Sequence, residues 1–341
     1  MTNNTIFSLV SSYTTKLQNH KSTANSKVKG DFQSELGVTE AIDLESIASE
    51  KLPQSSFCDT LTLLIDLENE SLQYIKCDVQ SIVCEVLGVD KTYLYMHSDK
   101  VLDASTINKI DEKINRYNSS EPLAYILGYK YFWNQKLKVT QDTLIPRSDT
   151  EVLVQAVLDD IITSRDYPLN NLDTLSVLDL GTGTGAIALA LAGELPNAMV
   201  VAVDYSTAAL NVAKENAINN NINNVEFVQS DWYKNIKGKK FDIIVSNPPY
   251  IDSYDNDIDE EVKDYEPALA LFANDNGLAD IEAIISQAKY FLAENGRIYI
   301  EHGYTQSASV LEIFQKHGFV NAEIIQDLNS RDRCSKAERV R

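Results

Sequence analysis

The sequence predicts an α/β protein with a doubly wound, mostly parallel sheet that has an antiparallel edge strand. From about residue 146 onward, apolar strand-like runs alternate with helical stretches, which is typical of parallel sheets covered by helices. Between about 57 and 125, apolar residues recur at helical spacing, which predicts a small helical bundle. Residues 128–145 change to partly alternating aromatic and β-branched residues around Asn134-Gln135, which predicts a β-hairpin between the two parts.

Length, charge and cysteine use narrow the possible functions. The 341 residues are enough for two domains, and no apolar stretch reaches the 18 residues that a membrane span needs. A net charge of −20 disfavours binding to a phosphate backbone and favours a protein or small-molecule partner. The four cysteines form no CxxC pair and lie near no histidine at metal-ligand spacing. We therefore expect core cysteines in a reducing compartment and no metal site.

The first segment, residues 1–55, is polar and poorly patterned, and we expect a disordered extension. Residues 1–30 contain four lysines but no aspartate, glutamate or arginine. The lysines loosely suit an organellar transit peptide, whereas the missing arginines do not. A cytoplasmic location is therefore expected, with organellar targeting by residues 1–30 as the less favoured alternative.

Residues 56–127 are expected to form a domain of four or five helices. Gly88 is placed to end one helix, and Ser105 to begin another that carries Ile107, Ile110 and Ile114. The hairpin at 128–145 then connects this domain to a third one, residues 146–341.

The third domain has a regular order of elements. Strands are predicted at 176–180, 199–204, 225–229, 241–247, 296–301 and 320–326. Helices are predicted at 149–163, 185–194, 206–220, 278–294 and 305–317. The last strand, at about 333–340, is expected to form the antiparallel edge.

The end of the fourth of these strands carries the most informative motif, Asn247-Pro248-Pro249-Tyr250. Two prolines end the strand abruptly, because proline cannot donate to the sheet. An asparagine at this position lies where open α/β sheets bind ligands. The oxygen of Asn247 and the carbonyl of Pro248 are then two adjacent acceptors for a substrate –NH2 group. The alternative is a plain strand stop, in which the prolines only shape a turn.

A glycine-rich loop lies at the end of the first strand of the same sheet. It comprises Gly181, Thr182, Gly183, Thr184 and Gly185, and a helix follows at once. The spacing is GxGxG, which differs from the GxGxxG of dinucleotide binders and from a phosphate-binding P-loop. The next strand ends in Asp204, which can accept hydrogen bonds from ribose hydroxyls. After the third strand, Asp231 and Trp232 can contact an adenine, although Trp232 taken alone favours a core position. A nucleoside-bearing ligand without pyrophosphate is predicted, and S-adenosyl-L-methionine is the ligand that fits.

Together these motifs resemble the class I (Rossmann-like) methyltransferases, and the full set resembles the HemK/PrmC family of release factor glutamine N5-methyltransferases. The resemblance is carried by these stretches: VLDLGTGTGAIALALA at 177–192, VVAVD at 200–204, SDW at 230–232, IVSNPPYI at 244–251, EPLAYILG at 121–128, IPRSDTE at 145–151, EPALAL at 266–271 and EHGY at 301–304. It covers about 57–333. Residues 1–55 have no counterpart in the usual family pattern, and the basic carboxyl end is less β-like than usual.

The resemblance implies an enzyme that transfers a methyl group from S-adenosyl-L-methionine to the N5 amide nitrogen of the glutamine in the Gly-Gly-Gln loop of class 1 peptide chain release factors. It implies a cofactor pocket at Gly181 to Gly185, Asp204, Trp232 and Asn247. It implies that the motif at 247–250 holds the substrate glutamine, with Asn247, Pro248 and Tyr250 as the catalytic residues. The helical domain would help to bind the release factor. We expect a monomer with no membrane partner and no direct nucleic-acid partner.

Two other functions stay open at this point. One is a methyltransferase acting on the amino groups of adenine N6 or guanine N2 in nucleic acids, and the other is a non-catalytic binding module on the same fold. The acidic segment 252–266 is either a solvated loop or a lip that attracts a basic protein. The sequence leaves the roles of Arg147 and Glu301 undecided between structure and chemistry.

Overall fold

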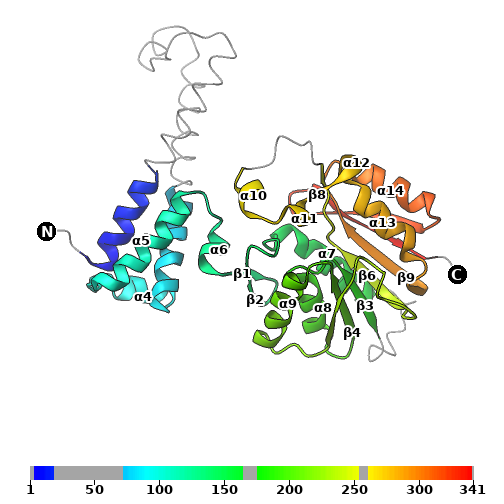
Figure 1. Cartoon of the computed structure of the whole chain (residues 1–341), viewed down its shortest axis with the longest axis horizontal. Helices are drawn as coiled ribbons and strands as arrows, with labels where there is room; N and C mark the ends of the chain where they lie inside the picture. The colour runs from blue at the N-terminus through cyan, green and yellow to red at the C-terminus, as the bar shows by residue number, and fades with distance from the viewer. Residues whose placement is uncertain (1–3, 19–71, 164–174, 253–259, 340–341) are drawn as a thin grey trace, which may run out of the picture. The chain divides into compact units, whose positions relative to one another are not determined.

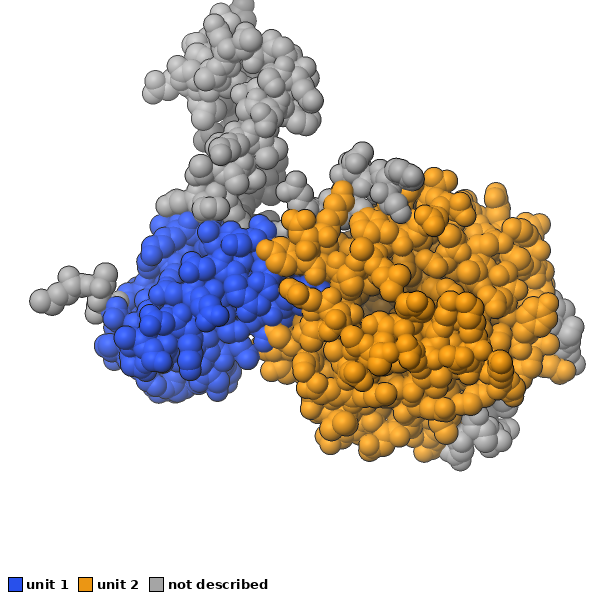
Figure 2. Space-filling model, viewed as in Figure 1, with its two compact units in different colours: residues 1–127 blue, residues 128–341 orange. Residues whose placement is uncertain are grey.

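The computed structural model of the chain describes residues 4–18, 72–163, 175–252 and 260–339. These form two compact units, residues 1–127 and residues 128–341, which are coloured separately in Figure 2. The predicted hairpin thus belongs to the second unit rather than standing between two domains. The apolar pattern expected between residues 57 and 71 lies outside the described residues.

The first unit is helical. Its helices span residues 6–18, residues 72–87, α4 (Lys91–Met96), α5 (Ala104–Asn118) and α6 (Leu123–Leu127). The helix at 6–18 differs from the expected disordered extension. Its residues Ile6, Val10, Tyr13 and Leu17 follow at intervals of four and three, and all four are buried in the core of this unit. This short apolar stripe was hidden by the polar composition around it.

The helix caps of this unit correct one detail of the sequence analysis. Helix α5 begins after Asp103, whose side chain accepts a hydrogen bond from the backbone N–H of Thr106 at 2.9 Å. Ser105, the predicted cap, lies inside the helix instead. Aspartate and serine are about equally good caps, so the sequence alone does not decide between two candidates two residues apart.

The second unit begins with the hairpin β1 (Tyr129–Phe132) and β2 (Gln135–Lys138) and then builds a seven-stranded sheet. The strands of the sheet are β3 (Ser176–Leu180), β4 (Met199–Asp204), β5 (Val225–Gln229), β6 (Phe241–Ser246), β9 (Leu292–Glu301), β10 (Val320–Gln326) and β11 (Asp332–Glu338). Their order is β10-β11-β9-β6-β3-β4-β5. The sequence analysis identified each of these strands along the chain, although β9 begins at Leu292, within the stretch 278–294 that was predicted to be helical. The doubly wound fold is confirmed.

The position of the last strand was predicted wrongly. Strand β11 is antiparallel to both of its neighbours, but it lies between β9 and β10, so that β10 forms the edge. Burial explains this order. Cys334, Ser335 and Ala337 of β11 are buried, whereas nearly every residue of β10 is exposed. An exposed, polar strand is suited to the edge, and a buried one is not.

Helices cover both faces of the sheet (Figure 1). Helices α7 (Glu151–Thr163), α8 (Ala186–Glu194) and α9 (Thr207–Asn219) contribute to one core, and α13 (Ala279–Ala288) and α14 (Ser307–Lys316) contribute to the other. The remaining short elements are η1 (Ser148–Thr150), β7 (Ile251–Asp252), α10 (Glu260–Tyr265), α11 (Ala268–Leu271), β8 (Phe272–Ala273) and α12 (Asn274–Gly277). Because helices cover both faces of the sheet, a ligand is expected to bind at the edge where the parallel strands end.

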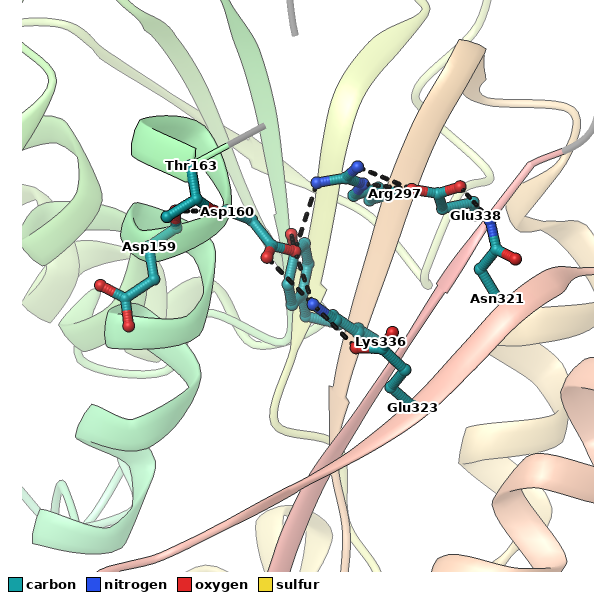
Figure 3. A network of polar contacts seen from close by, with 9 residues as sticks. Asp159, Asp160, Thr163, Arg297, Asn321, Glu323, Lys336 and Glu338 are labelled. Carbon is teal, nitrogen blue, oxygen red and sulfur yellow. Dashed lines mark hydrogen bonds and ion pairs between the residues drawn. The ribbon is translucent and has the colours of Figure 1, made fainter. Parts of the chain in front are cut away.

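A polar network fixes α7 to the sheet (Figure 3). The carboxylate of Asp160 accepts from Lys336 Nζ at 2.9 Å and from Tyr299 Oη at 2.7 Å, and Arg297 lies 3.3 Å away. Arg297 also pairs with Glu338 at 2.7 Å. The network therefore joins α7, β9 and β11.

Candidate active site

The glycine loop and the NPPY motif (residues 247–250) begin side by side. Strands β3 and β6 are parallel neighbours in which Leu180 is paired with Ser246. The hydroxyl of Ser246 donates a hydrogen bond to the carbonyl of Leu180 at 2.7 Å and is completely buried. The next residue on each strand is Gly181 or Asn247. The sheet therefore brings together the two motifs that the sequence separates by more than sixty residues.

The three glycines of the loop have different roles. All three have positive φ angles, of 75° at Gly181, 55° at Gly183 and 86° at Gly185, which favour glycine. A Cβ at Gly185 would lie 3.1 Å from Leu189 and 3.2 Å from Ala213, so this glycine permits close helix packing. A Cβ at Gly183 would have no neighbour within 4 Å. The backbone at Gly183 therefore faces open space that a ligand can occupy.

The two threonines of the loop turn their side chains inward. The Thr182 hydroxyl donates to Asp179 at 2.6 Å, and the side chains of Thr182 and Thr184 are buried. Only their backbone groups are thus suited to contact a ligand. Asp179 is itself fully buried, its Oδ1 has no hydrogen-bond partner, and burial raises the pKa of this carboxyl to about 7.

Asp204 supports the loop and still has acceptor capacity. Its Oδ2 accepts from the N–H of Gly183 and its Oδ1 from the N–H of Ser206, both at 2.8 Å. Each carboxylate oxygen has a second lone pair, so two positions remain for ribose hydroxyls. Burial raises the pKa of Asp204, while the backbone hydrogen bonds oppose that shift.

Trp232 lies against the glycine loop. A Cβ at Gly181 would meet its ring at 3.4 Å. The indole also forms a hydrogen bond with Asp280, which lowers the pKa of that carboxyl, although burial raises this pKa more. The ring is half-buried and packs on the second core, so it takes part in both core and site. Asp231 accepts from Lys234 at 2.6 Å through Oδ2 on the surface, and its Oδ1 is the oxygen left for a ligand.

Asn247 has a defined orientation. Its Nδ2 donates to the Thr150 hydroxyl at 3.2 Å, which leaves Oδ1 as the end available to a substrate. Thr150 is the last residue of η1, within the IPRSDTE stretch. That stretch holds other parts of the site as well. Arg147 pairs with Glu266, and Asp149 pairs with Arg333 at 2.9 Å.

Two contacts hold the backbone at the end of the NPPY motif. The carbonyl of Tyr250 accepts from Gln306 Nε2 at 2.9 Å. A Cβ at Gly277 would lie 2.0 Å from the same carbonyl oxygen, so only glycine permits this contact. These two residues keep the turn after Pro249 in place.

The side chain of Tyr250 is held by a buried acid. Its hydroxyl donates to Glu301 Oε1 at 3.1 Å. Glu301 is 1% exposed, and burial raises the pKa of this carboxyl to about 7. Burial also raises the pKa of the Tyr250 phenol, with the Glu301 charge adding to the effect.

The structure assigns roles that the sequence left undecided or did not indicate. Arg147 pairs with the buried Glu266, whose other oxygen accepts from the N–H of Ile145 at 3.0 Å, so Arg147 orders its own segment. Thr150 and Gln306 were not identified from the sequence, because no periodicity or motif marks their contacts. Gly277 follows an asparagine, and this pair is a turn signal that could have been noticed.

The structure describes the acidic segment 252–266 at Asp252 and from residue 260 onward. Residues 253–259 lie outside the described residues. Glu266 is buried and paired with Arg147, so this acid does not belong to a charged surface lip.

The described residues contain no group of three or more histidine, cysteine, aspartate or glutamate residues arranged to hold a metal ion. Among the same residues, no helix is both long and apolar enough to cross a membrane.

Comparison with known proteins gives two matching family models. Residues 67–128 match the PrmC N-terminal domain, and residues 171–336 match a methyltransferase domain.

Several curated proteins are similar over most of their length. A release factor glutamine methyltransferase from Francisella tularensis is 63% identical over 264 residues, which cover 77% of this chain and 90% of that protein. Proteins of the same name from Aliivibrio fischeri and Haemophilus influenzae are 41% and 40% identical, each over 76% of this chain and over 88% and 90% of their own lengths.

Proposed function

The chain belongs to the release factor glutamine methyltransferase family, and we propose that residues 247–250 perform this methyl transfer by orienting the amide nitrogen of a substrate glutamine. The enzyme acts on a glutamine of peptide chain release factors and uses S-adenosyl-L-methionine. The single observation that carries the proposed role of the site is the hydrogen bond from Asn247 Nδ2 to Thr150, because it leaves Asn247 Oδ1 for the substrate.

The chemistry explains why orientation is needed. An amide nitrogen is a weak nucleophile, since its lone pair is delocalised into the carbonyl. The bound cofactor supplies an electrophilic methyl group on a sulfonium. The chain's own residues must hold the nitrogen about 3 Å from that methyl and in line with it.

Asn247 and Pro248 are suited to this task. In the proposed arrangement, the two amide hydrogens of the substrate bond to Asn247 Oδ1 and to the carbonyl of Pro248. The remaining lobe of the nitrogen then faces the methyl group. Positive charge grows on nitrogen during transfer, so both acceptors bind more strongly in the transition state than before it. Pro249 and Tyr250 limit water access around the amide. No strong base is required before the transfer, and one proton leaves to solvent afterwards.

The cofactor position follows from the loop. The open space at Gly183 and the spare acceptors of Asp204 support a nucleoside lying across the loop. The ring of Trp232 over Gly181 supports stacking on the adenine. Thr182 and Thr184 contribute backbone groups, and Asp231 contributes Oδ1, the oxygen that does not accept from Lys234.

The substrate is expected to bind as a folded protein. The net charge of −20 favours a partner with a basic surface near its glutamine loop. The helical unit, residues 1–127, is proposed to contact that partner, and the chain is proposed to act as a cytoplasmic monomer. A nucleic-acid amino group is not favoured, because the similar curated proteins carry the name of a protein-glutamine enzyme.

The experiment is mass spectrometry of a recombinant class 1 release factor after incubation with the enzyme and S-adenosyl-L-methionine. A gain of about 14 Da, one methyl group replacing one hydrogen, is expected on the glutamine of the Gly-Gly-Gln loop. Asn247→Ala is expected to lose at least about a hundredfold in kcat, since a preorganised transition-state acceptor is worth this much. Asn329→Ala, an exposed asparagine in the turn between β10 and β11, serves as the matched control. Methylation of DNA or ribosomal RNA in place of the release factor would refute the proposal.

A further inference from the structure

We propose that Glu301 is a positioning residue for this reaction, which aligns Asn247 and Tyr250 through one hydrogen-bonded chain that passes through Thr150. The inference rests on the proposed function and adds a residue to it. Its physical basis is two hydrogen bonds, from Tyr250 to the buried Glu301 carboxylate at 3.1 Å and from Asn247 to Thr150 at 3.2 Å. The hydroxyl of Thr150 also lowers the pKa of Glu301, and the hydrogen bond between these two residues is the step that we propose.

The sheet places Glu301 beside the motif. Strand β9 is the parallel neighbour of β6, with Ile300 paired to Ser246. The residue after each partner, Glu301 or Asn247, therefore lies at the same edge. Thr150 reaches this edge from η1, at the start of the unit's first long helix.

The hydrogen bonds of the proposed chain all run in one direction, from Asn247 through Thr150 to Glu301. Asn247 donates to the Thr150 oxygen, so the Thr150 hydroxyl proton is free to be donated onward. The hydroxyl of Tyr250 donates to Glu301 Oε1 at 3.1 Å, and both this hydroxyl and that of Thr150 lower the pKa of Glu301. In the proposed chain, Thr150 donates to the same carboxylate. An ionised carboxylate only accepts, so it forces both hydroxyls to donate toward it. Such a chain polarises the Asn247 amide and makes its free oxygen a better acceptor.

A structural role alone does not account for this arrangement. The nearby cations make their ion pairs with other acids, because Arg147 pairs with Glu266, and Arg333 Nη2 pairs with Asp149 and with Asp327 at 3.1 Å. Arg333 Nε is buried without a hydrogen-bond partner, and the charge of Arg333 lowers the pKa of Glu301 without an ion pair between them. Glu301 Oε2 is buried and has no hydrogen-bond partner within 3.5 Å. Such an oxygen is costly to the fold. Hydrogen bonds in active sites often shorten once the substrate is bound, and the Thr150 contact has room to do so.

The charge of Glu301 is expected to change near neutral pH. Burial raises the pKa of Glu301 to about 7, and hydrogen bonds from Thr150 and Tyr250 limit the shift. The other titratable or charged groups that face it or its partner Tyr250 are Arg333, Asp149, Cys334 and Arg147. Protonated Glu301 has a hydrogen of its own to donate, so one of the two hydroxyls loses its acceptor. Turnover should then fall as the pH drops below about 7.

The experiment compares the wild-type enzyme with Glu301→Gln, Thr150→Val and Thr150→Ser on intact release factor. The measurements are kcat and KM between pH 5.5 and 8.5, with cofactor affinity by calorimetry as the test of folding. Glu301→Gln is expected to lower kcat about 10- to 100-fold, to leave KM and cofactor affinity within about twofold, and to abolish the loss of activity at acid pH. Thr150→Val should have a similar effect, and Thr150→Ser should restore kcat to within about threefold of the wild type. The double variant should be no worse than either single one.

The outcomes separate this inference from the proposed function. If the wild type leaves the release factor unmethylated, the proposed function fails. If the wild type is active and Glu301→Gln keeps its kcat and acid limb, only the positioning role fails. Should Glu301→Gln not fold, the threonine pair decides, and normal turnover of Thr150→Val would overturn the inference.

Discussion

Two acidic centres, Asp160 beside Tyr299 and Glu301 itself, lie along one face of strand β9. They differ in which groups compensate the negative charge. Tyr299 and Glu301 are two residues apart, so their side chains share a face. At Tyr299, the carboxylate of Asp160 receives Lys336, Arg297 and the tyrosine hydroxyl (Figure 3). At Glu301, the carboxylate has hydroxyl neighbours and one oxygen without a partner. The first centre is a closed network that stabilises the fold, and the second is the one that we propose to position the NPPY motif.

The difference follows from what each centre must do. Cations beside Asp160 offset its desolvation and join three elements of the fold. A direct cation at Glu301 would neutralise the carboxylate and remove its pull on Thr150 and Tyr250. The fold thus tolerates an incompletely satisfied acid at the edge where the ligand binds, as is common at functional sites.

The largest expected effect is a loss of stability when the closed network around Asp160 is disrupted. Asp160→Ala leaves Lys336 and Arg297 largely buried without their shared acceptor. We expect the free energy of unfolding to fall by about 2–3 kcal/mol, less than for a fully buried pair because water reaches the site. Urea unfolding measures this. Asp159→Ala, on the same helix but exposed, should change stability by less than about 0.5 kcal/mol.

Activity of the folded Asp160→Ala enzyme separates the two centres. The kcat of the folded fraction should stay within about twofold of the wild type, because the closed network makes no contact with the NPPY motif. A large loss of kcat without a loss of stability would mean that the two centres act as one.

The second prediction concerns the open centre. Tyr250→Phe keeps the ring but removes the hydrogen bond to Glu301. We expect kcat to fall about tenfold, which is the worth of one hydrogen bond to a charged group, with little change in stability. The pH at which activity is half lost should rise, since a stabilising donor to the Glu301 carboxylate is gone. Tyr304→Phe, an exposed tyrosine at the same edge, is the control and should behave as the wild type. An unchanged pH profile for Tyr250→Phe would contradict this coupling.

The third prediction is a pH dependence of stability to which Glu301 contributes, as the buried Asp179 also does. The pKa of Glu301 is about 7 in the folded chain, above the ordinary value of 4.5. Between these values the folded state binds more protons than the unfolded state, so stability falls as the pH rises from about 4.5 to about 7. Glu301→Gln removes this contribution and should therefore gain stability relative to the wild type over that range. Urea unfolding of the wild type and of Glu301→Gln at several pH values measures the difference, and an equal pH dependence of the two would contradict the prediction.

The sequence predicted the fold and the two motifs of the site because both depend on local patterns. Strand periodicity, the glycine loop and the prolines at 248 and 249 each follow from a few adjacent residues. The family resemblance then ordered these motifs into one site. What it missed depends on contacts between distant segments. Thr150 meets Asn247, and Gln306 meets Tyr250, only after the sheet has formed.

The same reason explains the errors of detail. The order of β10 and β11 depends on which strand the helices bury, and a single strand's pattern does not show this. The helix at 6–18 depends on a core supplied by residues 75–126. Its four apolar residues have no burial site until those helices are present.

The smallest effect is expected at the rim of the closed network. Glu323 lies 3.1 Å from Lys336, but its side chain is 62% exposed on the edge strand. An exposed ion pair is worth little, so Glu323→Ala should lower the free energy of unfolding by at most about 0.5 kcal/mol, and less at high salt. Lys336 keeps Asp160 as its acceptor in this variant. Urea unfolding at low and high salt provides the measurement. A loss above about 1 kcal/mol would show that the network depends on the exposed residue Glu323. The contrast between the two centres would then be weaker, because neither Asp160 nor Glu301 would have all its partners within the core.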